Sequence, residues 1–261
     1  MTFDIHKDEK FILCAVRFIA QKQWFIAGDV DGNIHVYTYT TKYKLKEFQA
    51  HKRWVTSLAV HPTDPFVLSS GDDNLIKLWN WESGWECIRS FQEHSALVDS
   101  VKFNPLTKSN SFASASRDGT IKIWSILSDT PITTLRFSTD GFRMNWVHYF
   151  VVHGNQEYIV VRSDDGGTAQ IWDLETETCI RHITGVQYCY CGVAAIDCLP
   201  GHPILVTVSR KNIVSFCNST THRYQNMVNF NVGPIVDLAY IKGTRSLVVA
   251  GVNGIAIMKI S

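Results

Sequence analysis

The sequence lacks an excess of charge of either sign. Its 261 residues include 25 lysines and arginines against 24 aspartates and glutamates, a formal net charge of +1. A protein that holds nucleic acid by neutralising phosphates needs a surplus of positive charge, so this balance argues against a nucleic-acid ligand. The same balance gives no reason to expect adsorption on an anionic membrane. Composition therefore predicts neither kind of electrostatic partner.

Long apolar runs are also missing. No stretch approaches the roughly 18 consecutive apolar residues that a membrane-spanning helix needs. The run at residues 11–16 ends at Arg17, and residues 7–10 mix both signs of charge, which is unlike a secretory signal. We expect no integral membrane segment, and the run is typical of a buried strand.

The seven cysteines include no Cys-x-x-Cys pair. The nearest approach to a cluster is Cys189, Cys191 and Cys198, which lacks a second ligand pair at the spacing of a zinc finger. Scattered cysteines of odd number are typical of small buried residues in a reducing compartment. With no nucleotide-binding loop either, we expect neither a metal nor another cofactor.

What the sequence does contain is an internal repeat. Short apolar segments such as Ile121-Lys122-Ile123-Trp124 recur six times, and their last residues are Tyr37, Trp79, Trp124, Trp172, Phe216 and Met258. The gaps between these positions are 42, 45, 48, 44 and 42 residues. A period in the forties is that of a WD40 blade, a sheet of four short antiparallel strands.

Each repeat has the internal order of a blade. A tight turn precedes the last apolar segment, as at residues 31–32, 73–74 and 118–119, where Gly or Asn accepts the backbone conformation that hairpins need. No long segment has helical periodicity. We therefore expect an all-β chain, a single WD40 β-propeller domain over residues 1–261 with six readable blades.

Repeats two and three each contain a histidine, a serine, an aspartate and a tryptophan. The two sets are His51, Ser69, Asp73 and Trp79, and His94, Ser114, Asp118 and Trp124. A serine, a histidine and an aspartate could form a catalytic triad. Two copies at a constant offset from a tryptophan instead resemble the structural tetrad of WD40 blades. That resemblance implies that Asp accepts from the His ring and that Ser links His to the indole N–H, so we expect no enzyme activity.

The other repeats depart from this pattern. Repeat one keeps Asp31 but has no matching histidine, and repeat four has one extra residue in its turn, at residues 164–167. Repeat five has no aspartate in its turn, and repeat six offers Asn253 alone. We expect these blades to depend on apolar packing and the second half of the chain to be looser.

The sequence is compatible with two arrangements of the ring. Residues 2–5 are typical of an outer strand, and pairing them with the last repeat, residues 235–260, would close a six-bladed ring and remove exposed sheet edges. The alternative is an incomplete seven-bladed ring. The sequence is compatible with both arrangements.

Four segments resemble the first propeller of the coatomer β′ subunit. They are residues 18–24, 50–63, 76–82 and 112–116, and the doubled tryptophan of residues 76–82 is the most distinctive. The resemblance is dense through residue 125 and thinner after about residue 137. The first blade, the second propeller and the helical solenoid of that family have no counterpart in this sequence, so the resemblance implies a short relative or a fragment of such a subunit.

The resemblance implies a site for C-terminal dilysine signals on cargo tails. Asp72 matches an acidic position that reads lysine, and Leu97 keeps an apolar contact. Arg53 stands where the family has an aspartate, and both Cys14 and Thr56 stand where it has arginines that take the terminal carboxylate. Since most charged partners are replaced, we expect dilysine binding to be impaired.

The peptide-contacting candidates are therefore Arg53, Trp54, Thr56, Asp72 and Leu97. Trp54 is included as a surface contact beside Arg53. The implied function is a non-catalytic scaffold for proteins or peptides, related to the COPI-type coat. Such a protein acts in transport between Golgi and endoplasmic reticulum, in the cytoplasm and peripherally on membranes, with coat subunits or cargo tails as partners.

Two alternatives stay open. A substrate receptor of a ubiquitin ligase would carry Trp-Asp-x-Arg at the end of a blade, whereas Trp172-Asp173-Leu174-Glu175 ends in glutamate. A remnant without retained function is the other alternative.

Overall fold

The computed structural model describes residues 12–41, 43–105, 110–136, 144–151, 157–163, 168–184, 193–198, 204–209, 213–218, 224–233, 235–241 and 244–259. It divides into two compact units, Met1–Val147 and His148–Ser261. The expected outer strand at residues 2–5 lies outside the described residues. No helix in the described part of the chain is long and apolar enough to cross a membrane.

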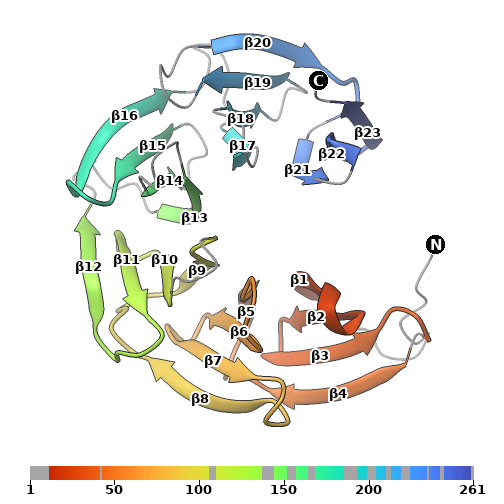
Figure 1. Ribbon diagram of the computed structural model, residues 1–261, viewed down its shortest axis with the longest axis vertical. Coiled ribbons are helices and arrows are strands. Elements are labelled where there is room, and N and C mark those ends of the chain that lie inside the picture. Colours follow the sequence, from red (N-terminus) through yellow and green to blue (C-terminus); the bar gives the residue numbers. More distant parts are fainter. Residues whose placement is uncertain are drawn as a thin grey trace. The chain divides into compact units, whose positions relative to one another are not determined.

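The fold is all-β, as expected, and consists of consecutive antiparallel sheets (Figure 1). The first sheet contains β1 (Leu13–Ile19), β2 (Trp24–Asp29), β3 (Asn33–Thr38) and β4 (Lys44–Gln49), with the 3₁₀ turn η1 (Ala20–Lys22) between β1 and β2. The second contains β5 (Val55–Val60), β6 (Phe66–Gly71), β7 (Ile76–Asn80) and β8 (Glu86–Phe91). The third contains β9 (Val98–Phe103), β10 (Ser111–Ser116), β11 (Thr120–Ser125) and β12 (Pro131–Arg136).

Three further sheets follow the same order. The fourth contains β13 (Met144–Val151), β14 (Glu157–Ser163), β15 (Thr168–Asp173) and β16 (Thr178–Thr184). The fifth contains β17 (Val193–Cys198), β18 (Ile204–Ser209), β19 (Ile213–Asn218) and β20 (Tyr224–Asn229). The sixth contains β21 (Ile235–Ile241), β22 (Ser246–Gly251) and β23 (Gly254–Lys259), and each sheet is one of the six expected blades.

Within the first unit, each sheet packs its face against the next sheet in chain order. We call the face that meets the following sheet the forward face and the opposite one the backward face. The forward face of sheet one, with Ile34 and Val36, packs on Val55, Leu58 and Val67 of sheet two. Side chains alternate between the two faces along each strand, so the inner strands β2, β3, β6 and β7 are buried at most positions, whereas the fourth strands β4 and β8 are largely exposed.

A glycine turn fixes the start of the second sheet. The carbonyl of Gly32 accepts the backbone N–H groups of Ala50 (2.9 Å) and His51 (3.0 Å). Gly32 has φ +90°, and a Cβ there would lie 2.1 Å from the carbonyl oxygen of His51. A residue with a side chain is therefore both strained and too large at this position. The turn of one sheet thus positions the histidine of the next.

Strand pairing corrects one member of the repeat. In sheet two a bulge falls between Leu78 and Trp79, and in sheet five the same bulge falls between Phe216 and Cys217. Cys217, not Phe216, therefore occupies the position of Trp79. Phe216 is instead part of the core shared with sheet six. The sequence pattern assigned the wrong residue because an apolar side chain is compatible with either strand register. The position of the bulge in the strand pairing allows one register only.

Candidate functional site

The structure brings together the four side chains of the tetrad in sheet two. His51 Nδ1 lies 2.8 Å from Asp73 Oδ1, and His51 Nε2 lies 2.7 Å from Ser69 Oγ. The indole Nε1–H of Trp79 donates to the same Ser69 oxygen at 2.9 Å. Asp73 also accepts hydrogen bonds from the backbone N–H groups of Lys52 and Leu75. It thereby joins its own turn to the loop that precedes β5.

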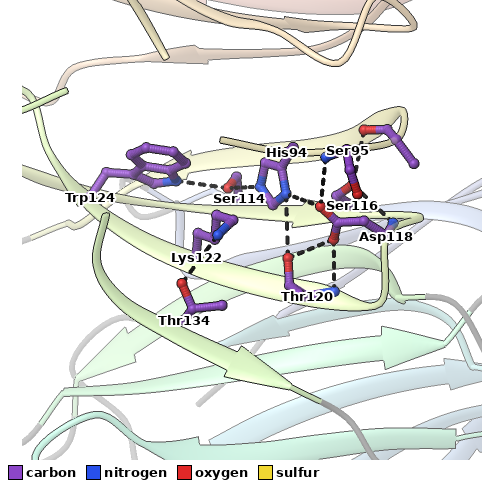
Figure 2. A network of polar contacts seen from close by, with 10 residues as sticks. His94, Ser95, Ser114, Ser116, Asp118, Thr120, Lys122, Trp124 and Thr134 are labelled. Carbon is purple, nitrogen blue, oxygen red and sulfur yellow. Dashed lines mark hydrogen bonds and ion pairs between the residues drawn. The ribbon is translucent and has the colours of Figure 1, made fainter. Parts of the chain in front are cut away.

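The tetrad in sheet three has the same geometry (Figure 2). His94 Nδ1 lies 2.7 Å from Asp118 Oδ2, His94 Nε2 lies 2.7 Å from Ser114 Oγ, and Trp124 Nε1–H donates to Ser114 Oγ at 2.8 Å. Figure 2 also shows the hydroxyl of Thr120 between the aspartate and the histidine; it donates to Asp118 Oδ1 at 2.6 Å. The close similarity of the two networks indicates a repeated structural device.

The hydrogen-bond directions within the tetrad are those that a catalytic triad would also have, so burial and the tryptophan distinguish the two. An ionised carboxylate only accepts, so the Nδ1–H of each histidine is the donor to aspartate, and in the neutral ring Nε2 accepts the serine O–H. The serine oxygen then accepts from the indole. Ser69 and Ser114 are fully buried, so a substrate carbonyl has no approach to either oxygen. Each tetrad instead supplies hydrogen-bond partners to polar side chains whose burial without partners would cost free energy.

Electrostatics support this assignment. Burial alone would raise the pKa of Asp73 and of Asp118, but the hydrogen bonds from their histidines outweigh it, so both pKa values lie below the usual range of an aspartate. At Asp118 the hydroxyl of Thr120 adds to the effect, and its pKa is lowered strongly. Both carboxylates are therefore ionised acceptors at neutral pH.

Sheet one contains a different polar network, and the expectation for it was wrong. Asp31, which occupies the position of Asp73, is exposed, whereas the buried carboxylate is Asp29 at the end of β2. Asp29 Oδ2 lies 2.7 Å from Nε2 of His35, a histidine within the same sheet, and His35 Nδ1 lies 3.3 Å from Glu47 on β4. The sequence pattern missed this pair because His35 occupies a position where repeats two to four have lysine or glutamine.

Sheet four also departs from the expectation of apolar packing alone. Trp172 Nε1–H donates to Oε1 of Gln170 at 3.0 Å, so a glutamine two residues earlier replaces the serine. The turn at residues 164–167 and residues 210–212 of repeat five lie outside the described residues. Among the residues that the structure describes, no group of three or more histidine, cysteine and acidic side chains could hold a metal ion.

The peptide-contact candidates lie at one end of sheets two and three. Trp54 is 53% exposed in the loop before β5, and the backbone N–H of Asp72 donates to its carbonyl at 3.0 Å. The Arg53 side chain, 72% exposed, pairs with Asp72 at 3.5 Å between Nη1 and Oδ2. Thr56 is less accessible, since its hydroxyl lies 2.9 Å from Ser70 Oγ and donates to the Val98 carbonyl of sheet three.

Leu97 occupies the place of Trp54 in sheet three, and Ile12 occupies it in sheet one. Each of the three carbonyls accepts one backbone N–H from the following hairpin, from Val30 to Ile12 (3.1 Å) and from Arg117 to Leu97 (2.9 Å). We call Ile12, Trp54 and Leu97 the rim triplet. Neither Ile12 nor the role of Arg117 was expected from the sequence, although superposing the repeats on their turn residues would have found both.

Arg117 forms the best ion pair at the rim. Its Nε lies 3.0 Å from Asp99 Oδ2 and its Nη2 lies 3.1 Å from Asp99 Oδ1, a bidentate arrangement. In sheet two, Asp72 occupies the position of Arg117 and pairs instead with Arg53 of the preceding loop. The rim therefore offers apolar side chains flanked by arginines that already have acidic partners. Such a surface suits an extended peptide with apolar residues.

Comparison with protein families agrees with the repeat. Residues 42–80 and 85–125 match the family described as WD domain, G-beta repeat, and each matched segment contains one complete tetrad. The WD40 repeats expected from the sequence are thus confirmed in these two segments. Similarity to a solved structure supports the same fold over nearly the whole chain. A chain described as part of the "Crystal Structure of Mitotic Checkpoint Complex" superposes with a TM-score of 0.82 at 15% identity, covering 97% of this chain and 76% of that chain.

Several curated relatives are coat subunits. Coatomer subunit beta'-2 of Arabidopsis thaliana is 44% identical over 107 residues, which are 41% of this chain and 11% of that protein. The probable coatomer subunit beta' of Schizosaccharomyces pombe is 33% identical over 178 residues, 67% of this chain and 21% of that protein. Nuclear distribution protein PAC1 of Coccidioides posadasii is 33% identical over 173 residues, 59% of this chain and 35% of that protein. The chain thus spans only 11% and 21% of the length of these two coatomer relatives.

Proposed function

We propose that this chain, a WD40-repeat β-propeller similar to part of the coatomer β′ subunits, is a non-catalytic protein-binding module of a vesicle coat. The observation that carries the proposal is the rim triplet. Three apolar side chains occupy equivalent places in consecutive sheets, and Trp54 is half exposed at the centre of the series. An exposed tryptophan next to an arginine-containing ion pair is the composition that protein-binding surfaces favour.

The proposed ligand differs from a dilysine tail. A lysine ammonium needs an available carboxylate, whereas Asp72 already pairs with Arg53, which repels a second cation. Thr56 and Cys14 supply no positive charge for a terminal carboxylate, and the Thr56 hydroxyl is engaged by sheet three. We therefore propose that cargo signals of the dilysine type bind poorly and that the rim contacts an apolar peptide segment of a coat subunit. The site of action would be the cytoplasmic surface of Golgi-derived vesicles.

Calorimetric titration tests the specificity. A peptide ending in Lys-Lys-x-x should give no heat signal of micromolar affinity with the wild-type chain. Arg53→Asp removes the repelling charge and places a second carboxylate beside Asp72, so this variant should bind the peptide more tightly than wild type does. Micromolar binding by the wild type would contradict the proposed loss of dilysine recognition.

Affinity capture tests the rim itself. The wild-type chain should retain coat subunits, and Trp54→Ala together with Leu97→Ala should lose them. Leu127→Ala is the matched control, because Leu127 is an exposed apolar residue in the turn at the opposite end of sheet three. Equal retention by all three proteins would rule out the rim as the contact surface, and retention of ubiquitin-ligase adaptors in place of coat subunits would favour the receptor alternative.

A further inference from the structure

Sheet four holds its tryptophan without the serine of the tetrad. Val161 of β14 pairs with Gln170 of β15 as Ser69 pairs with Lys77 in sheet two, so a valine occupies the place of the serine. A valine side chain has no hydrogen-bonding group. The indole N–H of Trp172 therefore donates to Gln170 Oε1, and Gln170 is itself only 5% exposed. The polar network of this sheet thus starts from a buried amide and not from a buried hydroxyl.

A bulge in β16, the neighbour of β15 (Figure 1), places two more polar side chains beside this amide. Trp172 pairs with Cys179 and Gln170 pairs with His182, whereas Ile180 is the extra residue of the bulge. Side chains alternate along a strand, so residues three positions apart lie on opposite faces unless a bulge intervenes. Because of the bulge, Cys179 and His182 lie on the face that also carries Trp172 and Gln170.

The hydrogen bonds among these four side chains run in one direction. An indole N–H only donates, so it fixes the Gln170 amide with Oε1 as the acceptor and Nε2 as the donor. Gln170 Nε2 lies 3.3 Å from Nδ1 of His182, which must therefore accept. A neutral imidazole that accepts at Nδ1 has its proton on Nε2, and His182 Nε2 lies 3.6 Å from Cys179 Sγ. The arrangement thus requires His182 to be neutral.

The thiol at the end of this series is not an activated nucleophile. Burial raises the pKa of the Cys179 thiol, so it keeps its proton at neutral pH, and its S–H donates to the Arg181 carbonyl at 3.4 Å. A base that activates a thiol needs a lone pair at His182 Nε2, where the proton is bound instead. Cys87 of sheet two has the same place and the same kind of backbone acceptor, but Ser90 stands at the position of His182. The histidine is therefore what distinguishes sheet four.

The surroundings of His182 leave its charge to the solvent and to the amide. Among the residues that the structure describes, its side chain forms hydrogen bonds with Gln170 and Cys179 and an ion pair with no residue. On its own strand the titratable group that faces it is Cys179. From β15, the strand packed against it, the facing group is Gln170, which does not titrate. His182 itself is exposed, so protons reach it from water.

We propose that His182 is a pH-sensitive switch that links β15 to β16 when it is neutral and releases them when it is protonated. In the protonated ring Nδ1–H faces the N–H of Gln170, and two donors form no hydrogen bond, so the exposed ring turns toward water. The cost falls on Gln170, because its buried amide N–H then loses its acceptor. Acid therefore loosens the outer strand of sheet four at Trp172. This switch is separate from the rim triplet and does not depend on it.

The pH dependence of the melting temperature tests the switch. His182→Gln is the matched variant, because glutamine can accept from Gln170 at one end and donate at the other but does not titrate. Since the folded chain favours the neutral ring, the contribution of His182 is complete above the pKa of an unfolded histidine, about 6.5, and is lost as the pH falls below it. Relative to His182→Gln, the wild type should melt about 2–4 °C lower at pH 5 than at pH 7.5, the shift expected for one hydrogen bond in a chain of this size. An equal difference at both pH values would overturn the proposal.

Gln170→Glu tests the direction of the hydrogen bonds. A carboxylate accepts both from the indole of Trp172 and from Nδ1–H of His182, so this variant favours the protonated ring. Its dependence on pH should therefore have the opposite sign, with the contribution of His182 present below about pH 6.5 and lost as the pH rises. The reference is the double variant with His182→Gln.

Nitrogen NMR of chains labelled in histidine is the second measurement, and it does not depend on how stable the variant is to heat. The His182 signals are identified by their loss in His182→Gln. At pH 7.5 they should be those of a neutral ring protonated at Nε2 in the wild type, and those of a ring protonated at both nitrogens in Gln170→Glu. The same protonation state in both proteins would overturn the proposed control of His182 by the amide.

Discussion

Asp118→Ala tests whether the tetrads stabilise the sheets. The Asp118 carboxylate accepts four hydrogen bonds: from His94 Nδ1 (2.7 Å), from the backbone N–H of Ser95 (3.1 Å), and from the N–H (2.9 Å) and hydroxyl (2.6 Å) of Thr120. It thereby joins the loop before sheet three to the hairpin between β10 and β11. Alanine removes both acceptor oxygens and therefore all four hydrogen bonds at once.

The expected cost follows from burial. The backbone N–H of Ser95 belongs to an exposed residue, so water can replace the carboxylate there. His94 and the Thr120 side chain are buried, and a buried donor left without an acceptor costs about 1–3 kcal/mol. We expect the free energy of unfolding to fall by about 1–3 kcal/mol. For a chain of this size that corresponds to a drop of about 2–12 °C in melting temperature.

Asp129→Ala is the control for loss of one negative charge. The Asp129 side chain is 75% exposed and pairs with Arg89, a contact that is worth little in water. Its removal should change stability by less than about 0.5 kcal/mol. Urea unfolding of the three proteins at pH 7 is the assay. Equal midpoints for Asp118→Ala and Asp129→Ala would refute a stabilising role of this tetrad.

Acid provides a second assay of the same carboxylate. The folded-state pKa of Asp118 is lowered because hydrogen bonds from His94 and Thr120 outweigh the effect of burial, which would raise it. In the unfolded chain the pKa of an aspartate is about 3.9. Its contribution is therefore complete above that pH and is lost as the pH falls below it toward the folded pKa. The stability difference between wild type and Asp118→Ala should narrow between pH 5 and pH 3; a constant difference would contradict the assignment.

Three further substitutions have defined outcomes. Asp29→Ala should lower the free energy of unfolding, measured in urea, by about 1–3 kcal/mol, because its histidine partner stays buried. Asp31→Ala should change it by less than about 0.5 kcal/mol, because Asp31 is exposed. A larger loss for Asp31→Ala than for Asp29→Ala would show that Asp31 is the structural carboxylate of this sheet. Gly32→Ala should destabilise the chain by more than about 1 kcal/mol, since the new Cβ meets the carbonyl of His51 at a backbone conformation that alanine avoids; a neutral thermal scan would contradict the close approach. Thr56→Val keeps the shape but removes the hydroxyl bond to the backbone of sheet three, so a loss of about 1 kcal/mol is expected, and no loss would show that the bond has no net value.

Some features of this protein were readable in the sequence because they are local. The tetrads of repeats two and three were predicted as residue sets, since each combines a turn aspartate with a tryptophan six residues later. The all-β fold followed from a repeat period and from hairpin turns, which depend on neighbouring residues. The same logic failed at Asp29, because its histidine lies at a position that no repeat pattern assigns.

Other features depend on which surfaces meet. Ile76 and Ile255 are the same residue type at the same repeat position, yet one is buried and the other is 70% exposed. No sequence pattern distinguishes them, because burial is a property of the neighbour and not of the residue. The pairing of Arg53 with Asp72 is also a tertiary fact, since the two residues lie on different loops of sheet two. The sequence by itself determined the strands and their turns, because these depend on residues close along the chain. It also identified the residues of two polar networks, because the same four residue types recur in repeats two and three. The tertiary structure alone decided which register sheet five adopts and which carboxylate is buried in sheet one, because strand pairing and burial depend on contacts that the repeat pattern does not assign.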